Sequence, residues 1–145
     1  RERLHHDLAT RPDAPADPTE REALVAALHA EKNRRYAQIV ASGALPLRPG
    51  VARLLREATA GSLRLAIATT TSRANVDALL GTHLGSGWAA HFVAVVCAED
   101  AQRKKPDPQV YRLCLERLGL DPEEALAIED SANGLAAATA AGLPT

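Results

Sequence analysis

The segment Ala-Leu-Ala-Ile-Glu-Asp-Ser-Ala-Asn-Gly, residues 125–134, is a short apolar run that ends in two acidic residues. Its apolar part, 125–128, has the length and composition of a buried strand, and the alanine-rich run that follows predicts a helix. Two carboxylates, Glu129 and Asp130, are costly at the end of a buried strand unless a cation offsets their charge. Such a small set of hard oxygen ligands favours Mg²⁺, which also bridges to phosphate groups. The pair equally suits an acidic helix cap, so alone it leaves both interpretations open.

Two further apolar runs lie upstream, at residues 63–68 and 92–97. Each is followed by a helical pattern, one beginning after Ser72 and one at Asp107-Pro108, and a short helix is predicted over 51–60 before the first run. Short continuous apolar strands that alternate with helices are typical of a parallel sheet with helices on its faces. The sequence therefore predicts an α/β fold with a parallel sheet of at least three strands.

Polar residues follow the first of these strands, where ligands bind in open parallel sheets. They are Thr69, Thr70, Thr71 and Ser72, and they lead directly into a helix. Hydroxyls and free backbone N–H groups at a helix N-terminus make an anion site, although the same residues also serve as ordinary helix caps.

A lysine follows the second strand. Lys105 is held between a loop and a helix start by Pro106 and the Asp107-Pro108 cap, and a fixed ammonium group can neutralise phosphate charge. A solvated basic turn is the alternative. Hydroxyls, a lysine and an acid pair at three successive strand ends together predict a cation site next to a phosphate site.

The N-terminal third of the chain is helical. Residues 1–9 predict a helix, three prolines make 11–18 a loop, and Asp17-Pro18 begins a long helix that ends near 42–43. Lys32 interrupts an apolar row at spacing four on that helix, either as a lysine at the edge of the core or as a substrate contact. Residues 45–50 predict a linker.

Composition excludes some classes of function. The 145 residues carry 17 basic and 18 acidic side chains, so a net charge of −1 gives no footprint for nucleic acid or an anionic membrane. No apolar run approaches the length of a membrane span. Cys97 and Cys114 have no metal-ligand spacing and are predicted to be buried reduced thiols. No glycine-rich nucleotide-binding motif follows any strand, which disfavours a nucleotide-binding Rossmann domain.

These motifs resemble those of the haloacid dehalogenase-like (HAD) phosphohydrolases. Thr69 resembles the second motif of that family, Lys105-Pro106 the third and Glu129-Asp130 the fourth. The run 128–138 is the most specific part, and it is similar to the subgroup of β-phosphoglucomutases and CbbY-type sugar-phosphate phosphatases. Residues 47–51 and 68–72 are most similar to CbbY.

The resemblance implies a division of labour along the chain. Residues 1–47 would form part of a small helical cap, and residues 48–145 part of a Rossmann-like core. The implied activity is a Mg²⁺-dependent phosphatase that hydrolyses a small phosphorylated sugar, such as a pentulose bisphosphate, through an aspartyl-phosphate. Thr69 and Lys105 would hold the phosphoryl oxygens as catalytic residues, and Asp130 with Glu129 would anchor Mg²⁺.

The resemblance also implies which residues contact the substrate and where in the cell the protein acts. The substrate contacts would be Thr70, Thr71, Ser72 and Asn133 in the core, with Lys32 and Arg1 in the cap. We expect a cytoplasmic protein, or a plastid one in a photosynthetic eukaryote, that acts as a monomer without nucleic acid or membrane partners.

One motif of the family is absent. The first motif, an apolar strand that ends in Asp-x-Asp, has no counterpart, because no two of the eight aspartates are one residue apart. In the family this strand precedes the cap, so we expect the chain to be partial and inactive by itself. A phosphomutase and a non-catalytic HAD-like interaction protein are the alternatives, and a dehalogenase is disfavoured by the acid pair.

Overall fold

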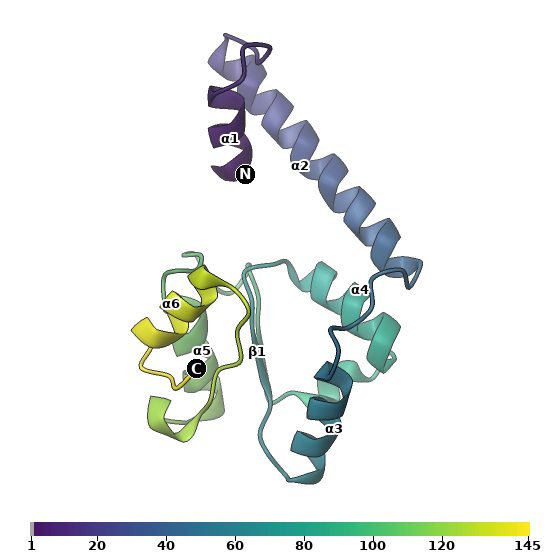
Figure 1. Ribbon diagram of the computed structural model, residues 1–145, viewed down its shortest axis with the longest axis vertical. Helices are drawn as coiled ribbons and strands as arrows, with labels where there is room; N and C mark the ends of the chain where they lie inside the picture. Colours follow the sequence, from purple (N-terminus) through teal and green to yellow (C-terminus); the bar gives the residue numbers. More distant parts are fainter. Residues whose placement is uncertain (1) are drawn as a thin grey trace. The chain divides into compact units, whose positions relative to one another are not determined.

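The computed structural model describes residues 2–145, which divide into two compact units, 2–45 and 46–145 (Figure 1). The boundary falls within the predicted linker. That the two units are a cap, 1–47, and a catalytic core, 48–145, stays a prediction, because the fold alone does not test their roles.

The first unit is a pair of helices, α1 (Glu2–Ala9) and α2 (Pro18–Ala41). The predicted cap of α2 is present, since the Asp17 carboxylate accepts hydrogen bonds from the backbone N–H groups of Thr19 at 2.7 Å and Glu20 at 3.0 Å. Leu8 of α1 and Val25 of α2 are buried. The first unit is therefore a helical hairpin whose local start and stop signals agree with the sequence.

The second unit is built around two parallel strands, β1 (Ala66–Ala68) and β2 (Ala94–Val96). Ala66 lies opposite Ala94 and Ala68 opposite Val96. The α/β class with a parallel sheet is thus confirmed. The other elements of this unit are α3 (Val51–Ala60), α4 (Arg73–Leu84), η1 (Trp88–His91), α5 (Gln109–Leu118), η2 (Pro122–Glu124) and α6 (Ala132–Ala140).

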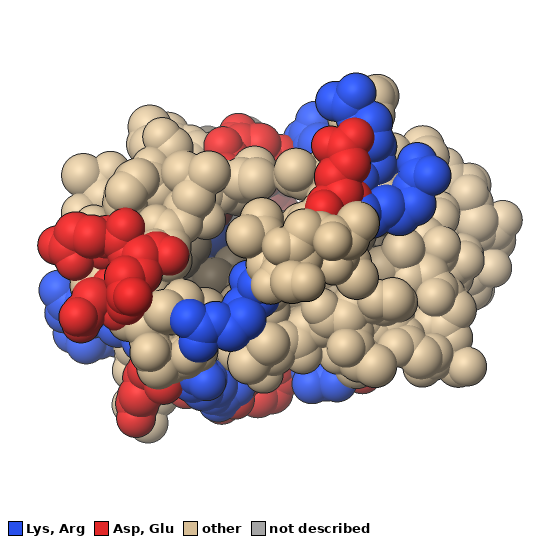
Figure 2. All heavy atoms as spheres, turned by 90° about the horizontal axis from the view of Figure 1, so that it is seen from below, with Lys and Arg blue, Asp and Glu red and all other residues tan. Residues whose placement is uncertain are grey.

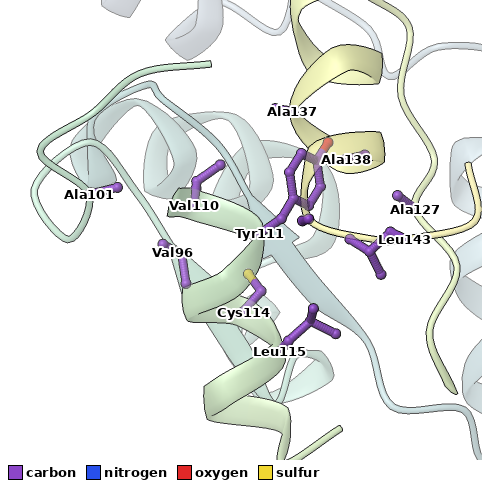
Figure 3. Packing of buried hydrophobic residues seen from close by; sticks show 11 residues of the cluster. Val96, Ala101, Val110, Tyr111, Cys114, Leu115, Ala127, Ala137, Ala138 and Leu143 are labelled. Atoms are coloured by element: carbon purple, nitrogen blue, oxygen red, sulfur yellow. The ribbon is translucent and has the colours of Figure 1, made fainter. Parts of the chain in front are cut away.

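Helices cover both faces of the sheet, because successive strand residues point to opposite sides. Val96 packs in a cluster with residues of α5 and α6, and Ala66 and Ala68 border that cluster (Figure 3). Ile67, Val95 and Cys97 pack on the other side, with α4 and η1. The two faces therefore have separate cores, one under α5 and α6 and one under α4 and η1.

The core under α4 contains the single tryptophan. The Trp88 side chain is 4% exposed, and its ring lies edge-on to Phe92 with the centroids 5.9 Å apart. The Arg73 guanidinium lies over the same ring, 5.2 Å from its centroid. The prediction for the thiols is confirmed as well, since Cys97 and Cys114 are free and buried. Burial raises the pKa of Cys114 to about 11.

The prediction of a third strand at residues 125–128 is wrong for the described residues. Residues 125–128 are not in a strand, although the backbone at Ala125 is extended. Leu126 and Ile128 are 70% and 72% exposed. A strand needs a neighbour for its backbone hydrogen bonds, and the apolar pattern that predicted this strand carries no information on whether that neighbour is present.

The surface carries both signs of charge. On the face drawn in Figure 2, acidic and basic side chains lie in small neighbouring groups, so that no large area of one sign is seen there. Among the helices that the structure describes, none has the length and apolar composition needed to cross a membrane.

Candidate active site

The residues that follow β1 form the capped start of α4. The Thr69 backbone N–H donates to the carbonyl of Val96 at 2.9 Å, which extends the pairing of the two strands by one residue. The Thr69 hydroxyl accepts from the backbone N–H of Thr71 at 3.2 Å, and the Ser72 hydroxyl accepts from that of Asn75 at 3.4 Å. The capping interpretation is therefore observed for Ser72. Phosphate binding by Thr69, Thr70, Thr71 and Ser72 stays a prediction.

The third and fourth motifs meet in a largely buried triangle of polar atoms. The Lys105 ammonium donates to Glu129 Oε2 at 2.6 Å and to the Tyr111 hydroxyl at 3.1 Å. The Tyr111 hydroxyl in turn donates to the same Glu129 Oε2 at 2.7 Å. The side chains of Lys105 and Glu129 are only 15% and 10% exposed. Residues 24 positions apart in the sequence thus form one ion pair. The peptide bond that follows Lys105, Lys105–Pro106, is cis.

The surroundings of Glu129 fill its hydrogen-bonding capacity. Its other oxygen, Oε1, accepts from the Ser131 hydroxyl at 3.0 Å and from the Asp130 backbone N–H at 3.2 Å. Burial alone would raise the pKa of Glu129, but the hydrogen bonds from Lys105, Tyr111 and Ser131 and the lysine charge lower it to about 2. Four donors match the roughly four lone-pair positions of a carboxylate. Glu129 is consequently a charged group with every acceptor position in use.

A glycine makes room for this carboxylate. Gly134 is buried in the first turn of α6, and a Cβ at this position would overlap the Glu129 side chain. The backbone N–H of Gly134 donates to the Ser131 hydroxyl at 3.0 Å. Ser131 therefore caps α6, and Gly134 in its first turn leaves space for the Glu129 side chain.

Asp130 differs from its neighbour, since its side chain is 61% exposed. It forms an ion pair with Arg48, whose guanidinium lies 2.7 Å from Asp130 Oδ2 and is itself 77% exposed. An exposed pair of this kind contributes little to stability and is easily exchanged. The described residues contain no cluster of three or more potential metal ligands. Mg²⁺ needs only one or two protein carboxylates when phosphate supplies other oxygens, so Asp130 fits this ion.

A largely apolar groove leads to the triangle. It has a volume of about 640 Å³ and is lined by Ala66 and Ala68 of β1, by residues 125–128, and by Tyr111 and Glu129. The exposed side chains of Leu126 and Ile128 belong to its wall. Glu129 and Tyr111 thus lie at the same groove as the strand β1.

The structure does not test three further predicted substrate contacts. Lys32 is exposed on α2 in the first unit, and Asn133 is exposed in the first turn of α6. Arg1 lies outside the described residues. Their roles stay predictions.

Four residues of the site were given no role from the sequence: Arg48, Tyr111, Ser131 and Gly134. Arg48 and Gly134 stand inside the segments that carry the family resemblance, which was the available signal for them. Tyr111 follows Lys105 by six residues and is among the buried residues of α5, a position that indicates only a core residue. No local pattern indicates its contact with Glu129, which lies 18 residues further along.

Comparison with known proteins supports the motif assignment. A family model described as a haloacid dehalogenase-like hydrolase matches residues 2–142. The plasmid-encoded protein CbbY of Cupriavidus necator is 58% identical over 119 residues, which make up 82% of this chain and 47% of that protein. The chain spans about half the length of the curated CbbY proteins it matches.

Solved structures agree. The crystal structure of CbbY from Rhodobacter sphaeroides in complex with phosphate matches with a TM-score of 0.82 at 40% identity, over 98% of this chain and 61% of that chain. A variant of the same protein, in complex with xylulose-(1,5)bisphosphate, matches with a TM-score of 0.83 at the same identity and coverage. These matches confirm the resemblance that the motifs at residues 69, 105 and 129–130 indicated.

Proposed function

Because this chain belongs to the haloacid dehalogenase-like hydrolase family, we propose that it is part of a Mg²⁺-dependent phosphatase that acts on a small phosphorylated sugar. The observation that carries the proposal is the largely buried pair of Lys105 and Glu129 beside the exposed carboxylate of Asp130. One relative was crystallised with xylulose-(1,5)bisphosphate, so a pentulose bisphosphate is the substrate class we favour.

Lys105 and Thr69 are assigned to the phosphoryl group. An ammonium group has three N–H bonds, and two of those on Lys105 already go to Glu129 and Tyr111. The third is assigned to a phosphoryl oxygen. Thr69 follows Ala68, which lines the same groove as Glu129, so its hydroxyl is assigned a second oxygen.

Asp130 is assigned to the cation. Glu129 would reach a metal ion only by giving up one of its four hydrogen bonds, whereas Asp130 need only release the exposed Arg48 side chain. Mg²⁺ bound there would offset the charge of the phosphoryl group during transfer. Asp130 would therefore hold the ion, and Glu129 would fix the position of Asp130 through the peptide bond that joins the two residues.

The nucleophile is assigned to a residue outside this chain. By the family resemblance, an aspartate on an apolar strand attacks phosphorus, and a second aspartate two residues later gives a proton to the sugar oxygen as it leaves. That second aspartate then takes a proton from the water that hydrolyses the aspartyl-phosphate. We place that strand in the groove between β1 and residues 125–128. The exposed Leu126 and Ile128 support this placement, because an apolar strand beside them would cover both.

The remaining assignments rest on the resemblance. Lys32 and Arg1 would contact the part of the substrate that does not react, and Thr70, Thr71, Ser72 and Asn133 would line the core side. Two buried free thiols suit a reducing compartment, so we place the enzyme in the cytoplasm.

The test is a phosphate-release assay of the longest reading frame that contains this chain, over sugar mono- and bisphosphates, with MgCl₂ or with a chelator. We expect release that requires Mg²⁺ and that falls at least about 100-fold in Asp130→Ala. Asp77→Ala, which also removes an exposed aspartate from an ion pair with an arginine, is the matched control and should retain activity.

The outcomes separate the alternatives. Transfer of phosphate between positions of one sugar, without release, would identify a mutase. Absence of both reactions across the panel would favour a non-catalytic interaction protein and would refute the proposal.

A further inference from the structure

The Tyr111 hydroxyl is the one group in the buried triangle that the proposed function does not use. It accepts a hydrogen bond from the Lys105 ammonium at 3.1 Å and donates one to Glu129 Oε2 at 2.7 Å. Lys105 also lies over the face of the Tyr111 ring, 4.6 Å from its centroid. The lysine thus contacts both the hydroxyl and the ring of Tyr111, in addition to its ion pair with Glu129.

The position of this hydroxyl is fixed by packing. Tyr111 is 7% exposed and lies on α5 among Val110, Cys114 and the alanines of α6 (Figure 3). A ring enclosed in this way has few rotamers open to it, so its oxygen is a rigid point within the site. Lys105, by contrast, ends a flexible four-carbon chain whose ammonium can adopt many positions unless it is held.

Two fixed acceptors determine how the lysine presents its remaining donor. The ion pair with Glu129 alone leaves the ammonium free to rotate about that contact. A second acceptor at Tyr111 removes this freedom and directs the third N–H to one place. A donor that is positioned before the reaction stabilises developing charge without further reorganisation.

We propose that Tyr111 is a positioning residue. Its hydroxyl holds the Lys105 ammonium against Glu129, an arrangement that we call the lock, and so directs the third N–H of Lys105 toward the phosphoryl group. This inference rests on the proposed function for its catalytic consequence. The lock itself is a property of the folded chain and is testable without any reaction.

The variant is Tyr111→Phe, which keeps the ring and the packing and removes only the hydroxyl. The first readout is the rate of reductive methylation of Lys105, followed by mass spectrometry. The chain has three lysines, so Lys32 and the exposed neighbour Lys104 serve as references in the same sample. We expect the rate at Lys105, relative to Lys104, to rise about tenfold, the factor for one lost hydrogen bond to a charged group. Tyr36→Phe, the same change at the other tyrosine, should leave the ratio unchanged.

The second readout is steady-state kinetics of the longest reading frame that contains this chain. We expect kcat to fall about tenfold in Tyr111→Phe while KM changes less than about twofold, because the contact matters most when charge develops. A general loosening of the fold would instead lower the thermal midpoint and raise the labelling of all three lysines together.

The two readouts distinguish the two hypotheses. If the wild-type protein releases no phosphate but labelling of Lys105 rises in Tyr111→Phe, the phosphatase proposal fails and the lock stands. If the wild type is active and Tyr111→Phe alters neither labelling nor kcat, the lock is refuted. An increase in labelling with an unchanged kcat would refute the catalytic consequence.

Discussion

Two consecutive stretches of the second unit, residues 125–128 and 129–134, reverse the usual relation between polarity and burial. Leu126 and Ile128 are 70% and 72% exposed, whereas the charged side chain of Glu129 next to them is only 10% exposed. The difference lies in where each stretch finds its partners. Glu129 receives its donors from Lys105, Tyr111 and Ser131 within the same unit, but the apolar stretch needs a neighbouring strand that the described residues do not supply.

The largest effect expected from disturbing this comparison is that of Lys105→Met. It leaves the Glu129 charge, whose side chain is 10% exposed, without its cation, and removing one partner of a fully buried pair costs about 3–5 kcal/mol. Because the pair retains some exposure, we expect a loss at the lower end of this range in urea unfolding. In the longest reading frame that contains this chain, we also expect phosphate release to fall at least about 100-fold. Lys104→Met removes an exposed lysine at the adjacent position and should change stability by less than about 0.5 kcal/mol. Equal stability of the two variants would contradict the role given to the pair.

Lowering the pH should measure the contribution of the same ion pair to stability without substitution of Lys105. The pKa of Glu129 is lowered from 4.5 to about 2, so its contribution is fully present above about pH 5 and is lost as the pH falls through 4.5 toward 2. The shift corresponds to at most about 3 kcal/mol. Urea unfolding of the wild type and of Glu129→Gln between pH 7 and pH 3 measures it as the difference between two curves. Those curves should converge as the pH falls, and parallel curves would show that Glu129 has an ordinary pKa.

A smaller effect is expected from Gly134→Ala, which tests the space under Glu129. The added methyl group overlaps the carboxylate, and overpacking of this kind costs about 1–3 kcal/mol. Gly81→Ala is the matched control, because Gly81 also lies in a helix of the second unit and has open space at its Cβ position. That change should stabilise by up to about 1 kcal/mol through helix propensity. Thermal unfolding followed by circular dichroism should therefore give midpoints that move in opposite directions.

The smallest effect is expected on the apolar side of the comparison. Leu126→Thr and Ile128→Thr alter exposed side chains, so each should change the unfolding free energy of this chain by less than about 0.5 kcal/mol. Val110→Thr, a similar change at a position that is 0% exposed, should cost about 1–3 kcal/mol. In the longest reading frame, the two exposed positions should become costly if a strand covers them. A large cost in the short chain would show that they are already covered.

The comparison also explains how far the sequence could lead. Helix starts depend on a few adjacent residues, so the caps at Asp17 and Ser72 were predictable. Lys105 and Glu129 were each indicated by their position after an apolar run. Their ion pair and the contact of each with Tyr111 depend on how α5 packs against the segment before α6. The strand at 125–128 was mispredicted because pairing depends on a neighbour, which no local pattern encodes.

The burial of the lone tryptophan has a practical consequence. Trp88 reports by its fluorescence on one place only, the core under α4, where Phe92 and Arg73 contact its ring. The first unit has no tryptophan, so its helices can melt without any change in this signal, while circular dichroism records them through the length of α2. Unfolding curves from the two methods that fail to coincide would thus show that the helical hairpin and the sheet unfold as separate cooperative units.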